Sequence, residues 1–203
     1  MMKLKICGIR DIETLKFVCD KGVHFAGFIM ADQSPRKASE DFLYLLENFN
    51  FQETKPVFVF VNPSINEVKK IVERVDSSIL QFHGDETDHF CRQFNQGFWK
   101  TIRVKDSLSY QSINDFPSAD AYLFETFSPG FYGGTGKVFD WGLLENIKLD
   151  QHSILAGGIN AENIKEAMSL NPWCIDINSG VESSIALKDI TLINQIIDIF
   201  NNG

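Results

Sequence analysis

A regular alternation of strand-like and helix-like segments constrains this chain more than any other feature of its sequence. Short apolar runs typical of buried parallel strands are each followed by a segment with apolar residues at helical spacing, along the whole 203-residue chain. The predicted strands are residues 3–8, 24–29, 55–61, 78–82, 98–103, 121–125, 152–156 and 173–177. The predicted helices are 11–21, 39–48, one beginning at 63, 86–95, 108–114, one beginning at 140, 161–170 and 189–201.

The pattern contains eight strand–helix units of about 25 residues each. Eight is the number of strands that closes a parallel sheet into a barrel. A doubly wound open sheet usually has fewer strands and binds its ligand at one switch point. Here every predicted strand ends in a polar or glycine-bearing loop, and no Pro-, Ser- or Gly-rich linker divides the chain. The sequence therefore predicts a single α/β domain over residues 1–203, a (βα)8 TIM barrel of near-minimal size.

Composition excludes several classes of function. The net charge is −8 and no basic tract occurs, which argues against nucleic acid or an anionic membrane as a partner. The four cysteines form no CxxC pair and no histidine cluster accompanies them, so we expect neither a disulfide framework nor a metal site. No apolar run approaches 18 residues and the N-terminus lacks a long apolar stretch, which predicts a reducing cytoplasm. Either Met1 or Met2 is compatible with the natural start.

Polar residues gather at the carboxyl ends of the predicted strands, which meet at one mouth in a closed barrel. They are Cys7, Arg36, Asn62, His83, Arg103, Glu125, Gly157, Gly158, Asp176, Ser179 and Gly180. Taken alone, Cys7 is equally consistent with a small buried apolar side chain. The whole set favours an active site at this mouth.

Cys7 and Glu125 form a candidate acid/base pair because they end the first and sixth strands, on different sides of the mouth. Two such groups flanking a bound ring can add a proton on one side and remove one on the other. A thiolate base needs a nearby cation, and Arg36 is the candidate. The alternative for Glu125 is a carboxylate paired with a lysine, and for His83 a hydrogen-bonded structural role.

Two glycine-bearing turns follow the seventh and eighth strands, at Gly157-Gly158 and at Ser179-Gly180. Barrels commonly hold a phosphate group at this place, on turn N–H groups and a helix N-terminus. Ordinary turns between strands and helices are the alternative. A long glycine-containing loop at residues 126–138 is the candidate for a lid that closes over the substrate.

Seven sequence motifs occur in the order typical of one enzyme family. They are KICGI at 5–9, GF at 27–28 with SPR at 34–36, VFVN at 59–62, LQFHGDE at 80–86, GGTG at 133–136 with FDW at 139–141, LAGGI at 155–159, and DINSGVE at 176–182 with KD at 188–189. Together they cover essentially the whole chain. In these motifs the sequence resembles phosphoribosylanthranilate isomerase, an enzyme of tryptophan biosynthesis.

The resemblance implies a (βα)8 barrel that needs no cofactor and binds a small phosphorylated substrate. It implies an Amadori rearrangement of N-(5-phosphoribosyl)anthranilate to 1-(2-carboxyphenylamino)-1-deoxyribulose 5-phosphate. By position, Cys7 is the general base and Glu125 stands where the family has its general acid. Further implied roles are substrate binding by Arg36, His83 and Asp176, and phosphate binding by Gly157, Gly158, Ser179 and Gly180. Because the family includes monomers and dimers, either state is compatible with the resemblance.

One departure from the family pattern affects catalysis directly. The family places aspartate before the threonine that precedes the long loop, whereas this chain has Glu125, which is one methylene longer. A misplacement of about 1 Å can lower a rate by about 10²-fold. The alternative hypothesis is therefore a barrel that binds the phosphorylated ligand but has weak or lost isomerase activity. An epimerase or indole-glycerol-phosphate synthase is disfavoured, because only Lys5 places a lysine near a strand end and it precedes Cys7.

Overall fold

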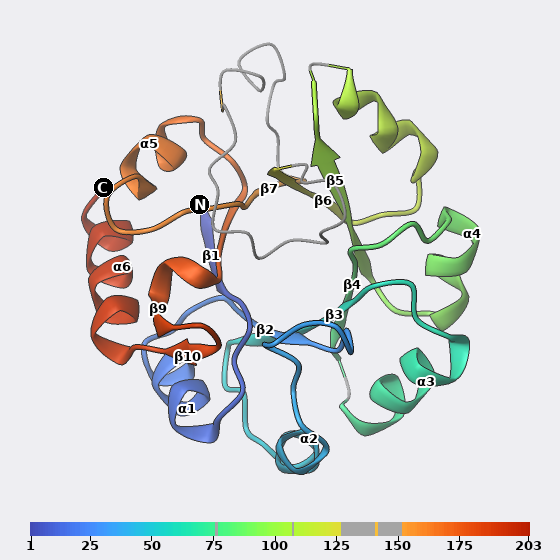
Figure 1. The fold of residues 1–203 in the computed structure, drawn as a ribbon, viewed down its shortest axis with the longest axis horizontal. Coiled ribbons are helices and arrows are strands. Elements are labelled where there is room, and N and C mark those ends of the chain that lie inside the picture. The colour runs from blue at the N-terminus through green and yellow to red at the C-terminus, as the bar shows by residue number, and fades with distance from the viewer. Residues whose placement is uncertain (76, 107, 127–140, 142–151) are drawn as a thin grey trace.

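Eight parallel strands close into one barrel in sequence order, with β8 pairing back to β1 (Figure 1). The computed structural model describes residues 1–75, 77–106, 108–126, 141 and 152–203. The strands are β1 (Lys3–Ile6), β2 (Phe25–Ile29), β3 (Lys55–Phe60), β4 (Ile79–Phe82), β5 (Phe98–Val104), β6 (Ala121–Thr126), β7 (Ser153–Leu155) and β8 (Cys174–Ile177). The barrel predicted from the alternating pattern is confirmed.

Helices surround this barrel in Figure 1. The α-helices are α1 (Ile12–Asp20), α2 (Glu40–Leu46), α3 (Ile65–Arg74), α4 (Asp88–Cys91), α5 (Ile164–Ser169) and α6 (Ile190–Asn202). The short 3-10 helices are η1 (Arg92–Phe94), η2 (Ser109–Asp115) and η4 (Ser179–Val181). The helix predicted from residue 140 lies outside the described residues except for Trp141, which is buried. No helix in the described ranges is long and apolar enough to cross a membrane.

Side-chain caps explain where several helices begin. The Asp11 carboxylate accepts a hydrogen bond from Thr14 N (2.7 Å) at the start of α1, and Ser39 Oγ accepts one from Phe42 N (3.2 Å) at α2. Ser64 and Glu67 form a reciprocal capping box at α3. Each cap satisfies a backbone N–H that has no partner within its helix. These caps place the helix starts within about two residues of the predicted ones.

The structure differs from the predicted elements in four places. The helix expected at 86–95 begins only at Asp88 (α4), where the Thr87 hydroxyl caps it by accepting from Phe90 N, and Glu86 before this cap pairs with Lys100. The segment expected as a helix at 108–114 is the 3-10 helix η2, which buries no side chain. Helix α5 is shorter than 161–170 because the side chains of Asn160 and Asn163 form a turn before it. The hairpin of β9 (Glu182–Ser184) and β10 (Leu187–Lys188) was not predicted.

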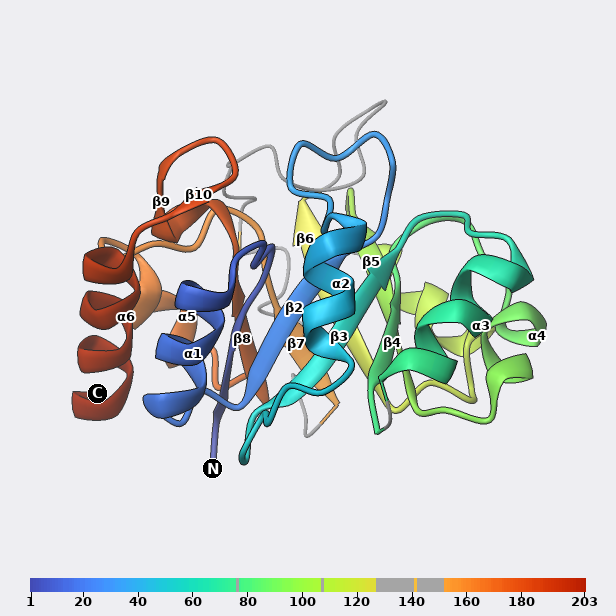
Figure 2. The same ribbon diagram turned by 90° about the horizontal axis from the view of Figure 1, so that it is seen from below.

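The inside of the barrel is apolar at one end and polar at the other. Phe25, Trp99 and Cys174 belong to an apolar cluster near the amino ends of the strands, where the rings of Phe25 and Trp99 lie 4.9 Å apart. The carboxyl ends lie at the opposite edge, which carries the β9–β10 hairpin, whereas both termini lie at the edge away from it (Figure 2). The apolar cluster fills the barrel at the amino ends of the strands, and the polar side chains lie at the carboxyl ends.

A fully buried lysine lies between these two regions. The Lys5 ammonium donates hydrogen bonds to Asp176 Oδ2 on β8 and to Gln81 Oε1 on β4, both at 2.8 Å. Burial alone would lower the pKa of Lys5, but the charge and hydrogen bond of Asp176, together with the charges of the Cys7 and Cys174 thiolates, outweigh it and the pKa is raised. Lys5 is therefore a permanent cation inside the barrel, and it ties three strands together.

We expect the substitution Lys5→Met to destabilise the fold by about 3–5 kcal/mol, because it leaves the Asp176 carboxylate buried without its partner. The double variant Lys5→Met/Asp176→Asn should lose less than the sum of the single losses, since it removes both charges. Urea unfolding measures all three proteins. Lys37→Met is the control: Lys37 makes an exposed ion pair with Asp32, so its loss should cost under about 1 kcal/mol. Equal losses for Lys5→Met and Lys37→Met would contradict this view of Lys5.

Candidate active site

The thiol of Cys7 lies directly after β1, in a buried position at the mouth of the barrel. Cys7 N donates to the carbonyl of Ile177 (2.8 Å), which continues the pairing of β1 with β8. On the neighbouring strand β2, a Cβ atom added to Gly27 would lie 2.7 Å from Cys7 Sγ and 3.0 Å from Cys7 Cα. Glycine at this position therefore makes room for the thiol.

Charged groups from three elements surround this thiol. Burial raises the pKa of Cys7, and the Asp176 carboxylate raises it further. The Lys5 ammonium lowers the Cys7 pKa through its charge and through hydrogen bonding, and Lys188 lowers it through its charge. Of these cations Lys5 has the largest effect. Arg36, predicted from the sequence for this role, also interacts with the Cys7 charge, which raises the pKa of Arg36. Lys5 was not predicted, although its two-residue spacing from Cys7 puts both on the inner face of β1.

Arg36 lies at the same mouth, held by an acidic partner. Its Nε and Nη2 atoms donate to the two carboxylate oxygens of Glu182, at 2.8 and 2.7 Å. Glu182 also accepts from Lys188 Nζ (2.8 Å), whose other acceptors are the carbonyl and side-chain oxygens of Asn178. The guanidinium, carboxylate and ammonium are all buried. Sequence reasoning did not single out Glu182 or Lys188, because nothing in their spacing indicates a pairing across the mouth.

Glu125 and His83 meet on the other side of the barrel. Glu125 Oε1 lies 2.6 Å from His83 Nε2, and both side chains are buried. His83 Nδ1 lies 3.0 Å from Thr101 Oγ1 and 3.3 Å from Gln81 Nε2. The structure thus brings together two residues that the sequence analysis treated separately, one as an acid and one as a substrate contact.

One oxygen of Asp176 has no partner. Oδ2 accepts from Lys5, whereas Oδ1 is buried and makes no hydrogen bond with any residue that the structure describes. Buried carboxylate oxygens are normally hydrogen-bonded, so an unpaired one at a barrel mouth indicates a place for a donor on a ligand.

The two predicted phosphate turns lie against each other. A Cβ atom on Gly180 would come within 1.9 Å of the Ile159 carbonyl oxygen, so η4 packs tightly on the turn that follows β7. Gly157 and Gly158 both have positive φ, of 91° and 68°. Their amide N–H groups donate no hydrogen bond to another residue in the described ranges, while Asn163 Nδ2 holds the Gly158 carbonyl (3.1 Å). Unused N–H groups in such turns are suited to an anion.

Two residues of the predicted set lie outside this arrangement. The Asn62 side chain accepts from Asp85 N (2.7 Å), and Arg103 forms an ion pair with the Asp85 side chain. Asn62 and Arg103 therefore support the loops after β3 and β4. The predicted lid at 126–138 lies outside the described residues apart from Thr126.

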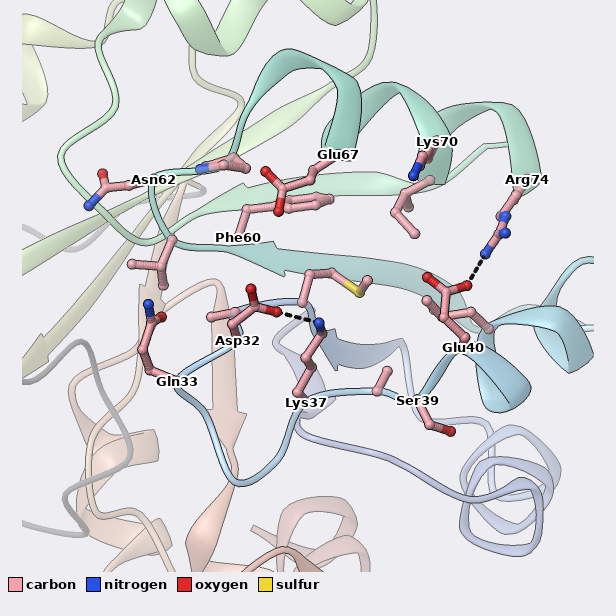
Figure 3. A pocket seen from close by; sticks show the side chains of 17 residues that line it. Asp32, Gln33, Lys37, Ser39, Glu40, Phe60, Asn62, Glu67, Lys70 and Arg74 are labelled. Carbon is pink, nitrogen blue, oxygen red and sulfur yellow. Dashed lines mark hydrogen bonds and ion pairs between the residues drawn. The ribbon is translucent and has the colours of Figure 1, made fainter.

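A cavity of about 540 Å³ lies between the loop after β2 and helix α3 (Figure 3), and neither Cys7 nor Glu125 lines this cavity. Its charged side chains are mostly engaged with each other: Lys37 pairs with Asp32, and Arg74 with Glu40. Because none of the buried acid/base residues lines it, we place the candidate active site at the barrel mouth. Within the described part of the chain, no three His, Cys, Asp or Glu side chains are grouped to hold a metal ion.

A closed (βα)8 barrel with a buried thiol and a buried carboxyl at its carboxyl-end mouth defines a barrel enzyme of the acid/base type. The family model for N-(5'-phosphoribosyl)anthranilate isomerase matches residues 4–199. The chain belongs to this family, and it is accordingly an isomerase of tryptophan biosynthesis.

Individual relatives agree with this assignment. The N-(5'-phosphoribosyl)anthranilate isomerase of Caldanaerobacter subterraneus is 36% identical over 98% of this chain and 97% of its own length. That of Hahella chejuensis is 38% identical over 97% and 92%. Among solved structures, phosphoribosyl anthranilate isomerase from Thermotoga maritima covers both chains fully, with a TM-score of 0.88 and 25% identity.

We expect the substitution Gly27→Ala to lower stability by about 1–3 kcal/mol, because the new methyl group overlaps both the Cys7 thiol and its backbone. Displacing the thiol by about 1 Å should also lower kcat by about 10²-fold. Thermal unfolding and isomerase kinetics measure the two effects. In the double variant Cys7→Ala/Gly27→Ala, part of the stability loss should be recovered, since Sγ is gone. An unchanged Tm and kcat in Gly27→Ala would contradict the close approach of β1 and β2.

Proposed function

We propose that this protein rearranges N-(5'-phosphoribosyl)anthranilate to 1-(2-carboxyphenylamino)-1-deoxyribulose 5-phosphate, with Cys7 as general base and Glu125 as general acid. The observation that carries the proposal is the placement of these two proton-transfer groups on β1 and β6 of one barrel mouth, each buried and each held by a polar partner. Two groups on different sides of a bound sugar suit a reaction that adds one proton and removes another.

In the first step, Glu125 donates its proton to the furanose ring oxygen. The bond between C1 and this oxygen breaks, and the nitrogen lone pair forms the C1=N bond of a protonated Schiff base. The ring oxygen leaves as the C4 hydroxyl group and Glu125 becomes a carboxylate. In the second step, the Cys7 thiolate takes the C2 proton, and the electrons of that C–H bond neutralise the Schiff base to an enolamine. Tautomerisation of the enolamine gives the ketone.

Lys5 supports the base in this scheme. A buried thiolate is unfavourable without a nearby positive charge, and the Lys5 ammonium supplies one from the same strand. Because burial still raises the pKa of Cys7, the thiol form predominates at neutral pH. In the proposed reaction, the small fraction of Cys7 that is in the thiolate form removes the C2 proton of the bound substrate.

Arg36 and Asp176 would bind the anthranilate end of the substrate. The contact of Arg36 with Glu182 uses Nε and Nη2, which leaves Nη1 for the anthranilate carboxylate. The unpaired Asp176 Oδ1 suits the substrate amine N–H. His83, the remaining candidate for substrate binding, would act through its contact with Glu125.

The phosphate would bind at Gly157, Gly158, Ser179 and Gly180. Two observations support this. The backbone N–H groups of Gly157 and Gly158 donate no hydrogen bond to another residue in the described ranges, and the turn that contains them packs closely on η4. A solved phosphoribosyl anthranilate isomerase holds reduced 1-(o-carboxyphenylamino)-1-deoxyribulose 5-phosphate, a phosphorylated ligand of the same class.

We also propose that residues 1–203 act as one cytoplasmic domain, as a monomer or homodimer. All eight barrel strands belong to one sheet, which supports a single domain. The phosphoribosylanthranilate isomerase of Thermotoga maritima is described as dimeric, which supports the second oligomeric state. No observation favours the alternative of a binding protein without activity, because the Glu125 carboxyl is buried at the mouth beside His83.

The variants Cys7→Ser and Glu125→Gln should each lower kcat by about 10²-fold or more, because each removes one proton-transfer group. Purified protein and its variants are assayed with N-(5'-phosphoribosyl)anthranilate, without added metal or cofactor. The buried but distant Cys91→Ser is the matched control and should keep wild-type kcat if it folds. Glu125→Asp should stay within about tenfold of the wild type. Wild-type turnover no better than buffer would overturn the proposed function.

We expect kcat/KM to rise with pH across and above about pH 8.5, where an ordinary thiol titrates. The reactive form is the thiolate, and burial raises the Cys7 pKa, so deprotonation is completed only at higher pH. Lys5→Met should move this rise to still higher pH, because Lys5 lowers the thiol pKa. Rate profiles measured within the stable pH range test both statements, with Lys37→Met as control. A profile that is flat from pH 7 to 10 would exclude Cys7 as the base in this form.

A further inference from the structure

A continuous line of hydrogen bonds crosses the inside of the barrel from the base side to the acid side. Lys5 Nζ donates to Gln81 Oε1 at 2.8 Å, and Gln81 Nε2 lies 3.3 Å from His83 Nδ1. His83 Nε2 lies 2.6 Å from Glu125 Oε1. All four side chains are buried and they come from β1, β4 and β6 or the residue after β4. Gln81 is the central member of this line, and neither the sequence analysis nor the proposed reaction gives it a role.

The direction of each hydrogen bond follows from the first one. An ammonium group only donates, so the atom of Gln81 that faces Lys5 must be the carbonyl oxygen. This fixes the orientation of the amide, and its NH2 group must point the other way. Gln81 Nε2 therefore presents N–H donors to His83 Nδ1 and to Thr101 Oγ1 (3.4 Å).

This orientation decides where the histidine carries its hydrogen. A hydrogen on Nδ1 would face the N–H group of Gln81, whereas an unprotonated Nδ1 accepts from it. The Thr101 hydroxyl, 3.0 Å from Nδ1, accepts from Gln81 and donates to Nδ1 in the same arrangement. A neutral imidazole with a bare Nδ1 has its hydrogen on Nε2. His83 Nε2 then donates to Glu125 Oε1.

We propose that Gln81, oriented by Lys5, is a positioning residue that keeps His83 neutral with its hydrogen on Nε2, so that the transferable proton is held by Glu125. This inference rests on the proposed role of Glu125 as the acid. Because a proton on Nδ1 is opposed by Gln81, the proton that the His83–Glu125 pair takes up from solvent binds the carboxylate. Oε1 is occupied by Nε2–H, so this proton binds Oε2, which has no hydrogen-bond partner among the residues described.

The charged groups around His83 are consistent with this assignment. Glu125 contacts the ring from β6, while Lys5 and its partner Asp176 lie beyond Gln81 on β1 and β8. The backbone on either side of His83 is fixed by Lys100 from β5, whose ammonium donates to the carbonyls of Phe82 (3.5 Å) and Gly84 (2.7 Å) and pairs with Glu86. The ring is thus held in one orientation, and Glu125 is the only carboxylate that contacts it within the described residues.

The state of the His83 ring is measured by NMR on 15N-labelled protein, with the His83 signals assigned by their loss in His83→Gln. In the wild type near pH 7 we expect a neutral ring with its hydrogen on Nε2. In Gln81→Glu, the new carboxylate accepts from Nδ1, so the ring should become a doubly protonated imidazolium. The proton is then held by the histidine, and kcat should fall at least tenfold with little change in KM.

The matched control is Gln93→Glu, which makes the same exchange at an exposed residue outside the barrel. In this variant the His83 ring should stay neutral with hydrogen on Nε2, and kcat should stay within about threefold of the wild type. An imidazolium or an Nδ1–H ring in the wild type would overturn the inference, even if Gln81→Glu fails to fold. A ring that stays neutral in Gln81→Glu would overturn it as well. Full activity of Glu125→Gln would instead overturn the proposed acid, whichever ring state NMR shows, so the two failures are distinguishable.

Discussion

The buried ion pair between Lys5 and Asp176 is the interaction on which the rest of this barrel depends. A charge inside a protein is tolerated only when partners replace its hydration, and Lys5 obtains them from β8 and from Gln81 on β4. The pair therefore fixes the relative positions of three strands. It also separates an apolar cluster around Phe25 and Trp99 from a polar mouth that holds Cys7. The same cation that joins the strands also lowers the pKa of the Cys7 thiol, two residues further along the chain. Lys5 therefore contributes both to the stability of the barrel and to the electrostatics of the candidate active site.

The polar mouth is organised as two sets of paired charges. On one side, Glu182 lies between Arg36 and Lys188; burial alone would raise the pKa of Glu182, but both cations outweigh it and the pKa is lowered. On the other side, His83 and Glu125 are joined, and Lys100 with Glu86 holds the backbone around His83. Buried charges arranged in this way contribute little net stability, because their desolvation offsets their attraction. Their effect is to hold each of the proposed proton-transfer groups in one position before a substrate arrives.

The sequence predicted the barrel because its alternation of strands and helices is a local pattern that repeats eight times. It failed where local pattern and long-range contact disagree: Glu86 was placed in a helix, but it precedes α4 and pairs with Lys100 on β5. Strand ends converge in any barrel, and on that ground the sequence predicted Cys7, His83, Glu125 and Asp176 as candidates at one mouth. Lys5 and Gln81 were not identified as parts of the site, although both occupy inward positions two residues before Cys7 and His83. The pairing of Arg36 with Glu182, 146 residues apart, leaves no trace in local spacing.

The longer acid at position 125 is understandable in these terms. A glutamate side chain has one more rotatable bond than aspartate, and a free carboxyl would sample several positions at the mouth. Here Oε1 is fixed at 2.6 Å from His83 Nε2, and the ring itself is held by Gln81 and Thr101. The conformational entropy of this extra bond is therefore lost when the protein folds, and it is not lost again at each turnover. In the proposed proton transfer, the position of Oε2 relative to the ring oxygen then depends on Lys5, Gln81 and His83 as much as on the length of the Glu125 side chain.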